Sequence, residues 1–168
     1  MPQSRYELAQ VNIAELLAPL DSEQLAGFVA ALEPINALAD QAPGFVWRLV
    51  GDGGADATSE RIFGTDLLVN MSVWRDLDSL GDFVFRGDHV AVMRQRRSWF
   101  ARMSQIYTAL WWVPAGVRPT VAEAEDRLTY LRTHGPTPYS FTFRESFPAP
   151  DADDVAVQIK IDSWSCPV

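Results

Sequence analysis

The sequence predicts an α+β protein in which strands and helices follow the order β-α-β-β-α-β, with a C-terminal α-β extension. Two observations predict this fold class. Short segments of alternating apolar and polar residues recur along the chain, and stretches with apolar residues at helical spacing separate them. Of the 168 residues, 48% are hydrophobic, which is enough for one domain with a substantial core.

The first strand and the first helix are expected at the start of the chain. Residues 6–13 alternate weakly, which predicts a strand whose one face carries Tyr6, Leu8, Gln10 and Asn12. A helix is expected to begin at Asp21, which forms a capping box with Gln24, and Pro34 is expected to kink it. One stripe of this helix holds Leu25, Phe28, Val29, Leu32, Ile35, Asn36 and Ala39.

Two further strands are expected before the middle of the chain. Residues 45–50 are rich in β-branched and aromatic side chains and predict the second strand. Residues 51–66 carry four glycines among small polar residues and predict a loop. Residues 67–74 predict the third strand, in which Leu67, Val69, Met71 and Val73 face away from Leu68, Asn70, Ser72 and Trp74.

Two helical pieces and a fourth strand are expected next. Residues 78–86 and 88–104 have helical patterns, and Gly87 divides them, with Asp88 as the N-cap of the longer piece. Residues 107–113 predict the fourth strand.

The last part of the chain predicts one helix and two strands. The helix begins with a capping box of Thr120 and Glu123 and stops at Gly135, which precedes a proline. Residues 139–147 predict a fifth strand. Residues 155–161 alternate and predict an additional strand at a sheet edge or against a partner chain.

This order of elements is ferredoxin-like. We divide the chain into a single domain, residues 1–150, and a C-terminal extension, residues 151–168. Helices are expected to cover one face of the sheet. The other face is apolar and too large to be left exposed in a monomer, so we expect the sheet of an identical subunit to cover it in a C2 homodimer.

Composition excludes several classes of function. The formal net charge of −8 argues against nucleic acid as a partner. The sequence has neither an apolar run long enough to cross a membrane nor a secretory signal at its N-terminus, so we expect a cytoplasmic protein that does not bind membranes. The single cysteine, Cys166, has no partner for a disulfide and no neighbours for a metal site.

Candidate functional residues concentrate in residues 85–100 and 110–116, which hold one of two histidines, four arginines and three of six tryptophans. His89 falls in the first turn of the predicted helix after Asp88. Its apolar stripe contains Phe85, Val92, Arg96, Trp99 and Met103. A histidine at a helix N-terminus stays neutral and can act as a base, a hydrogen-bond partner or a ligand. A half-buried histidine that only helps to cap its helix is the alternative.

Two polar side chains complete the expected catalytic set. Arg96 lies near the His89 stripe, and an inward arginine can bind a carboxylate, phenolate or enolate, although a solvated arginine in surface ion pairs is the alternative. Asn70 lies on the same face of its strand as Trp74 and can orient a substrate oxygen.

Large side chains are expected to form the walls of a binding pocket. Trp111 and Trp112 are adjacent on a strand and point to opposite faces, so only one of them can line a given pocket. The alternative for most of these aromatic residues is a place in the core or an interface. The expected substrate-binding residues are Trp74, Trp99, Trp111, Trp112, Phe85 and Met103.

Residues 85–100 and 110–116, together with residues 44–49 and 135–143, resemble the DUF3291 family, small proteins related to the dimeric α/β barrels that include antibiotic-biosynthesis monooxygenases. The resemblance implies a dimeric α/β barrel. It also favours a functional role for His89, since a histidine before an arginine-rich helix that ends in Trp-Phe is a signature of the family.

The resemblance implies a small-molecule enzyme that acts on an aromatic or polyketide-like compound without a metal or organic cofactor. An enolate or phenolate would react with O₂ directly, while His89 takes or shuttles the proton and Arg96 or Asn70 stabilises the oxyanion. An isomerase or cyclase, and a binding protein for haem or another small ligand, are the alternatives. Haem-degrading barrels use an asparagine, a tryptophan and a helical histidine, and the matching residue types here, at a different spacing, are Asn12, Asn70, Trp74 and His89. The sequence contains no motif for a metal, a nucleotide or a nucleophilic serine.

Overall fold

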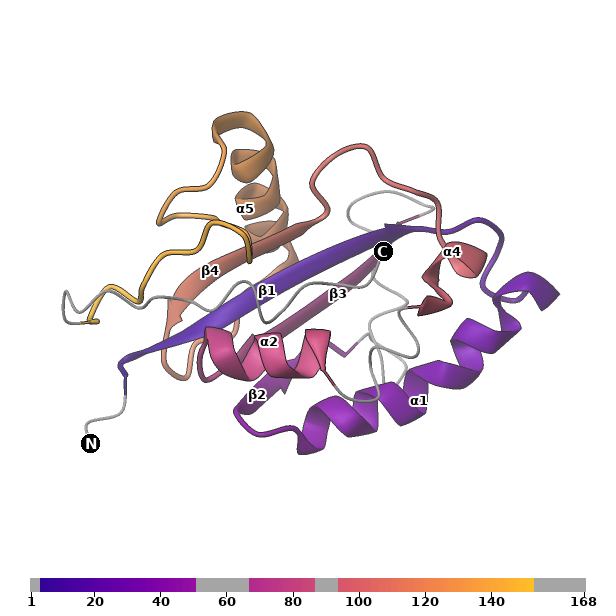
Figure 1. Ribbon diagram of the computed structural model, residues 1–168, viewed down its shortest axis with the longest axis horizontal. Helices are drawn as coiled ribbons and strands as arrows, with labels where there is room; N and C mark the ends of the chain where they lie inside the picture. The colour runs from indigo at the N-terminus through magenta and orange to yellow at the C-terminus, as the bar shows by residue number, and fades with distance from the viewer. Residues whose placement is uncertain (1–3, 51–66, 87–93, 153–168) are drawn as a thin grey trace.

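The computed structural model describes residues 4–50, 67–86 and 94–152, and within these ranges one sheet forms the centre of the molecule (Figure 1). The sheet has four antiparallel strands in the order β2-β3-β1-β4. Its strands are β1 (Tyr6–Glu15), β2 (Phe45–Arg48), β3 (Leu67–Trp74) and β4 (Thr108–Pro114). The helices are η1 (Glu23–Leu25), α1 (Ala26–Gln41), α2 (Leu77–Phe85), α4 (Arg96–Trp99) and α5 (Val121–His134). This order and pairing confirm the ferredoxin-like α+β prediction.

The central strand β1 separates two different sheet faces. Its side chains alternate as predicted, with Leu8, Gln10 and Asn12 on one face and Ala9, Val11 and Ile13 on the other. Strand β3 alternates in the same way, as the sequence predicts. Leu8, Gln10 and Asn12 of β1 lie opposite Trp74, Ser72 and Asn70 of β3. These six residues therefore share one face of the sheet.

Helix α5 packs on the face that carries Val11. Thr120 caps the helix by accepting a hydrogen bond from the Glu123 backbone N–H, as predicted, and Gly135 ends it with a φ of +76°. The helix buries Leu128 and Leu131 against the sheet. Members of this cluster are Ala9, Val11, Ile13, Val69, Met71, Val73, Ala109, Trp111, Val113, Val121, Ala124, Leu128 and Leu131. Helix α5 therefore buries this face within one chain, whereas we expected helices to cover only one face of the sheet.

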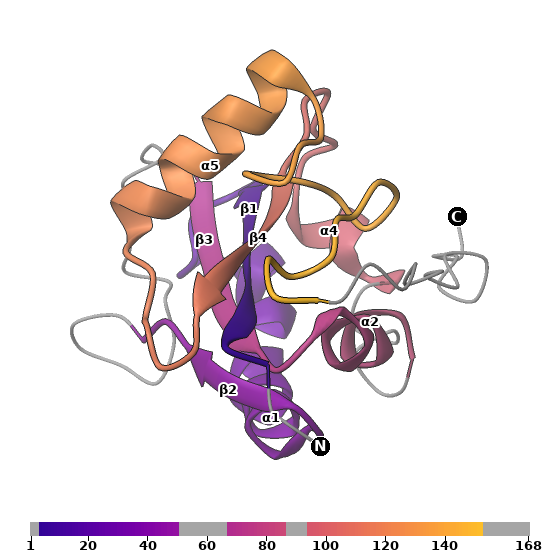
Figure 2. The same ribbon diagram turned by 90° about the vertical axis from the view of Figure 1, so that its left-hand side faces the viewer.

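Helices α1 and α2 belong to the other face, and Figure 2 shows α2 and α5 on opposite sides of the sheet. Helix α2 begins at its N-cap Asp76, whose side chain accepts a hydrogen bond from the Ser79 backbone N–H. A second core cluster lies here, with Leu8, Trp74, Leu77, Leu80, Leu110 and Phe141.

The predicted start of the first long helix is wrong. A short 3-10 turn precedes α1, and the N-cap of α1 is Leu25, which has no side-chain capping bond. The Gln24 amide nitrogen donates to the Ser98 carbonyl, 3.4 Å away, so this side chain contacts the α4 region. Pro34 lies inside α1, which continues on both sides of it.

The helix predicted over residues 88–104 ends earlier than expected, and the prediction is wrong from Phe100 onward. Residues 87–93 lie outside the described ranges, residue 94 is helical, and α4 ends the helical part of this region at Trp99. At Phe100 the chain becomes extended and pairs with Leu16, and the Ala101 N–H donates to the Glu15 carbonyl at 2.9 Å. Pairing with the end of β1 therefore replaces the helix.

Residues 139–147 do not form the predicted fifth strand. Phe141 makes one bridge to Leu110, with two backbone hydrogen bonds of 2.9 Å, and the chain then turns, because the Glu145 N–H donates to the Thr142 hydroxyl. The predicted loop at 51–66 and strand at 155–161 lie outside the described residues. Within the described ranges, the structure contains no helix with the length and apolarity needed to cross a membrane.

Candidate functional site

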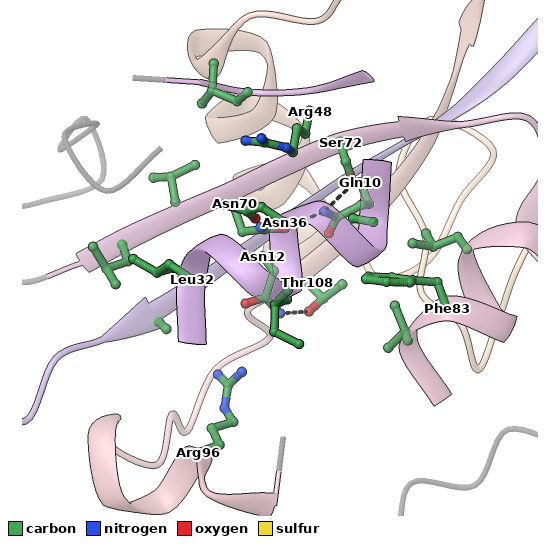
Figure 3. A pocket seen from close by; sticks show the side chains of 18 of the residues that line it. Gln10, Asn12, Leu32, Asn36, Arg48, Asn70, Ser72, Phe83, Arg96 and Thr108 are labelled. Carbon is green, nitrogen blue, oxygen red and sulfur yellow. Dashed lines mark hydrogen bonds between the residues drawn. The ribbon is translucent and has the colours of Figure 1, made fainter. Parts of the chain in front are cut away.

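A cavity of about 400 Å³ lies between α1 and the sheet face that carries Gln10 (Figure 3). Its walls are mostly apolar. Helix α1 contributes Phe28, Leu32, Ile35 and Ala39, helix α2 contributes Leu80, Phe83, Val84 and Phe85, and Trp99 of α4 and Trp74 of β3 add two indole rings. Cavities of this size and character are typical of small-molecule sites.

Five polar side chains form the bottom of the cavity, which we call the polar floor: Gln10, Asn12, Asn70, Ser72 and Thr108. Strand register brings them together. Asn12 of β1 lies opposite Asn70 of β3 and Thr108 of β4, and Gln10 lies opposite Ser72. The floor therefore draws on three neighbouring strands and carries no formal charge.

Hydrogen bonds fix most of the polar floor. The Gln10 amide nitrogen donates to Asn70 Oδ1 at 2.7 Å and to Ser72 Oγ at 2.9 Å, and Asn12 Nδ2 donates to Thr108 Oγ1 at 2.8 Å. Asn70 is the one exposed residue of β3. Since its oxygen is taken by Gln10, its amide nitrogen is left to donate to a molecule in the cavity.

Two arginines of different character lie at the cavity. Arg48 makes a bidentate pair with Asp40, with Nε–Oδ1 and Nη2–Oδ2 distances of 2.8 and 3.3 Å. Arg96 lies over two aromatic rings, 4.8 Å from the centroid of Tyr107 and 5.6 Å from that of Phe100. In Figure 3 its guanidinium reaches from α4 toward the polar floor.

The charged side chains among the described residues that line the cavity are those of Arg48 and Arg96. Among the described residues that line it there is no aspartate or glutamate, and Arg96 has no carboxylate within ion-pair distance in that part of the chain. An apolar pocket with a free guanidinium and neutral donors on its floor favours a ligand with an electron-rich or anionic oxygen.

The structure brings most of the expected site residues together. Arg96, Asn70, Trp74, Trp99 and Phe85 all line the cavity. His89, the expected base, lies outside the described residues.

Three expected wall residues do not line this cavity. Trp111 and Met103 pack in the cluster under α5, on the opposite sheet face, because residue 111 falls on the same face as Ala9 and Val113. Trp112 is on the cavity side of the sheet, but its indole N–H donates to the Phe147 carbonyl at 2.8 Å, so residues after α5 cover it.

Seven lining residues with polar side chains were not among the expected catalytic and substrate-binding residues: Gln10, Asn12, Asn36, Arg48, Ser72, Tyr107 and Thr108. The alternation of β1 and β3 placed Gln10 and Ser72 on the relevant faces. Only the register between strands 60 residues apart makes them neighbours, and no local pattern contains that register.

Across residues 4–50, 67–86 and 94–152, there is no cluster of three or more His, Cys, Asp and Glu side chains able to hold a metal ion. Asn12, Asn70 and Trp74, which we compared with the haem-degrading barrels, do share the cavity face.

Comparisons with known proteins give a family and several distant structures. The family described as "Domain of unknown function (DUF3291)" matches residues 7–157. No protein of curated function matches the chain significantly. Protein NE2512 of unknown function from Nitrosomonas europaea is 16% identical with a TM-score of 0.43, covering 69% of this chain and 95% of that one. SnoaB, a cofactor-independent oxygenase from Streptomyces nogalater, is 17% identical with a TM-score of 0.41, covering 68% and 96%. PA3566 from Pseudomonas aeruginosa is 12% identical with a TM-score of 0.46, covering 70% and 100%.

Proposed function

The chain belongs to the DUF3291 family, and we propose that it is a small-molecule enzyme of the antibiotic-biosynthesis-monooxygenase type. It acts without a metal or organic cofactor on an aromatic or polyketide-like compound. The observation that carries this proposal is the apolar cavity with a polar but uncharged floor, in which Arg96 has no ion pair with any described residue.

The cavity is suited to an acidic phenol or enol. Phe83, which is partly exposed, stacks on the buried Trp74 ring with centroids 5.1 Å apart and offers a flat wall to a planar ring system. Asn70 and Arg96 donate to the oxygen that becomes negative when the substrate loses a proton. Donors fixed in an apolar site stabilise such an oxyanion more than water does, because they do not have to reorient.

The reaction needs only the substrate and O₂. A CH₂ group next to an aromatic ketone loses a proton to give an enolate, which adds O₂ at carbon. Loss of water from the resulting peroxide leaves a new carbonyl, so that four electrons leave the carbon and O₂ ends as one carbonyl oxygen and one water. His89 is the proton acceptor in this proposal, a role that follows from the sequence.

The test begins with a ligand search. Phenolic and polyketide-like compounds are screened for quenching of tryptophan fluorescence, and each ligand is then incubated with the protein under ¹⁸O₂. We expect O₂ consumption and a product with one ¹⁸O atom. His89→Ala should lower turnover by about two to four orders of magnitude, the usual scale for a lost acid-base group.

Three outcomes would replace the proposal. Conversion of the ligand without O₂ would assign an isomerase or cyclase, and tight binding without conversion would assign a binding protein. A Soret absorbance band in the purified protein would assign haem.

A further inference from the structure

Three linked hydrogen bonds run beneath the cavity and end at Asn70. The Trp74 indole N–H donates to Ser72 Oγ at 2.8 Å, and the Gln10 amide nitrogen donates both to the same Ser72 oxygen and to Asn70 Oδ1, at 2.9 and 2.7 Å. Gln10 and Ser72 are each 7% exposed and Trp74 is 1% exposed. We call these four residues the Gln10 network.

The buried members of this network are held firmly. The indole N–H is a donor only, and packing between Phe45 and Phe83 fixes the Trp74 ring, with centroid distances of 5.4 and 5.1 Å. Ser72 is thereby anchored from one side. Both hydrogens of the Gln10 amide then have their own acceptor, so the orientation of this amide is fixed by two bonds at once.

Asn70, by contrast, lies at the open end of the network. It is exposed to the cavity, and among the described residues its side chain makes one hydrogen bond, which its oxygen accepts from Gln10. An asparagine amide is planar, so fixing its oxygen toward Gln10 directs its nitrogen away from Gln10, toward the cavity. Without Gln10, no described residue would determine whether the nitrogen or the oxygen of the Asn70 amide points toward the cavity.

We propose that Gln10 is a positioning residue, which holds the Asn70 amide with its N–H toward the cavity so that the site binds phenols and enols as their anions. The proposal rests on the proposed function and adds to it how the donor is oriented. Because a donor and an acceptor in the same place have opposite effects on a bound oxyanion, the orientation decides how readily a bound phenol or enol ionises.

The test uses 2-naphthol and 4-nitrophenol as probes, since the neutral and anionic forms of each absorb at different wavelengths. We expect the wild-type protein to lower the pKa of a bound probe by about one unit or more, because hydrogen bonds to the anion favour it. Asn70→Ala and Gln10→Met should each raise that pKa back toward its value in water.

A double-variant cycle separates positioning from a general structural role. If Gln10 acts only through Asn70, Gln10→Met should have no further effect on the probe in the Asn70→Ala background. With a true substrate, Gln10→Met should lower kcat on the order of 10- to 100-fold with little change in KM, as expected for a misplaced donor.

Leu8→Met is the matched control, because Leu8 precedes Gln10 by two residues on the same face, is fully buried and does not line the cavity. It should leave the probe's pKa unchanged. If Gln10→Met does not fold, Ser72→Ala, which removes one acceptor of the same amide, should raise the pKa by a smaller amount.

The outcomes distinguish this proposal from the function on which it rests. If the wild-type protein binds neither probe, or does not lower its pKa, the proposed function fails. If Asn70→Ala raises the pKa of the bound probe and Gln10→Met does not, the proposed function stands and the role of Gln10 is overturned. If Asn70→Ala instead lowers the pKa of the bound probe, Asn70 presents its oxygen to the cavity. That result would also overturn the role of Gln10.

Discussion

Arg48 and Arg96 lie at the same cavity but differ in how their charge is balanced. Both carboxylate oxygens of Asp40 bind Arg48, whereas Arg96 contacts the faces of Tyr107 and Phe100. A cation over aromatic rings keeps its N–H groups available at the ring edges. Of these two arginines, Arg96 is the one without an ion pair to a described residue, so it is the one we expect to bind an anionic substrate group.

We predict that Arg96→Ala weakens binding of an anionic ligand about 10- to 100-fold, since a hydrogen bond to a charged group contributes about 1.5–3 kcal/mol. The methyl ether of the same ligand, which cannot ionise, should bind almost unchanged. Titration of tryptophan fluorescence measures both affinities.

Arg97→Ala is the matched control, because Arg97 is exposed on the same short helix and does not line the cavity. Equal losses for the anion and its methyl ether would contradict an electrostatic role. If Arg96 binds the ground state and the transition state equally, Arg96→Ala should raise KM and leave kcat unchanged. A fall in kcat alone in this variant would confine the role of Arg96 to the transition state.

At the scale of elements, α2 supports one wall of the cavity, and Asp76 determines where it begins. The Asp76 carboxylate accepts bonds from the Ser79 N–H and hydroxyl at 2.8 and 2.7 Å and pairs with Arg75 at 3.0 Å. Burial raises the pKa of this carboxyl, but the hydrogen bonds from Ser79 and the charge of Arg75 outweigh burial and leave the pKa below its usual value of 3.8.

We predict that Asp76→Ala lowers the free energy of unfolding by about 1 kcal/mol at neutral pH, the usual cost of losing an N-cap. The charged form is the stabilised one, so its contribution is present above the ordinary pKa of 3.8 and is lost as the pH falls through the lower pKa of the folded state. The difference between wild type and variant in urea unfolding should therefore shrink in acid.

Asp76→Asn provides the control for charge. Its side-chain oxygen can still accept from the Ser79 N–H, so most of the capping energy should remain, without the pH dependence. A difference between wild type and Asp76→Ala that stays constant below the folded-state pKa would show that the carboxylate charge contributes nothing.

The elements that could be predicted from the sequence are those that local pattern determines. The bounds of β3 and the cap of α5 at Thr120 were both predicted, because alternation and capping involve residues a few positions apart. The helix expected through Phe100 and the strand expected at Phe141 failed. In each case a partner far away in the chain, Leu16 or Leu110, sets the backbone conformation.

The same limit applies to the site. Alternation alone places Asn70 and Trp74 on one face, and both line the cavity. The same alternation puts Trp111 and Trp112 on opposite faces, but it does not predict which face holds the cavity. The contact between Gln10 and Asn70 requires the register of two strands, which depends on the packing of the whole sheet.

At the scale of the whole molecule, the two sheet faces serve different purposes. One face carries the cavity, and the other is sealed by α5, so that Trp111 and Val73 are fully buried within one chain. The argument for a dimer from an uncovered apolar face therefore no longer applies. A homodimer remains a prediction from the family resemblance. Light scattering at micromolar concentration tests it: twice the mass of one chain would support the dimer, and the mass of one chain would contradict it.

Leu128 tests whether α5 is the cover that the fold depends on. It is 1% exposed and packs in the cluster under α5. We predict that Leu128→Ala lowers the free energy of unfolding by about 2–5 kcal/mol, the usual cost of a cavity in a core. Leu38→Ala on α1, where the leucine is 37% exposed, should cost far less. Because the cover belongs to the same chain, the cost of Leu128→Ala should be the same at about 1 and about 100 µM protein, whereas a cost that falls with concentration would show that a second subunit seals this face.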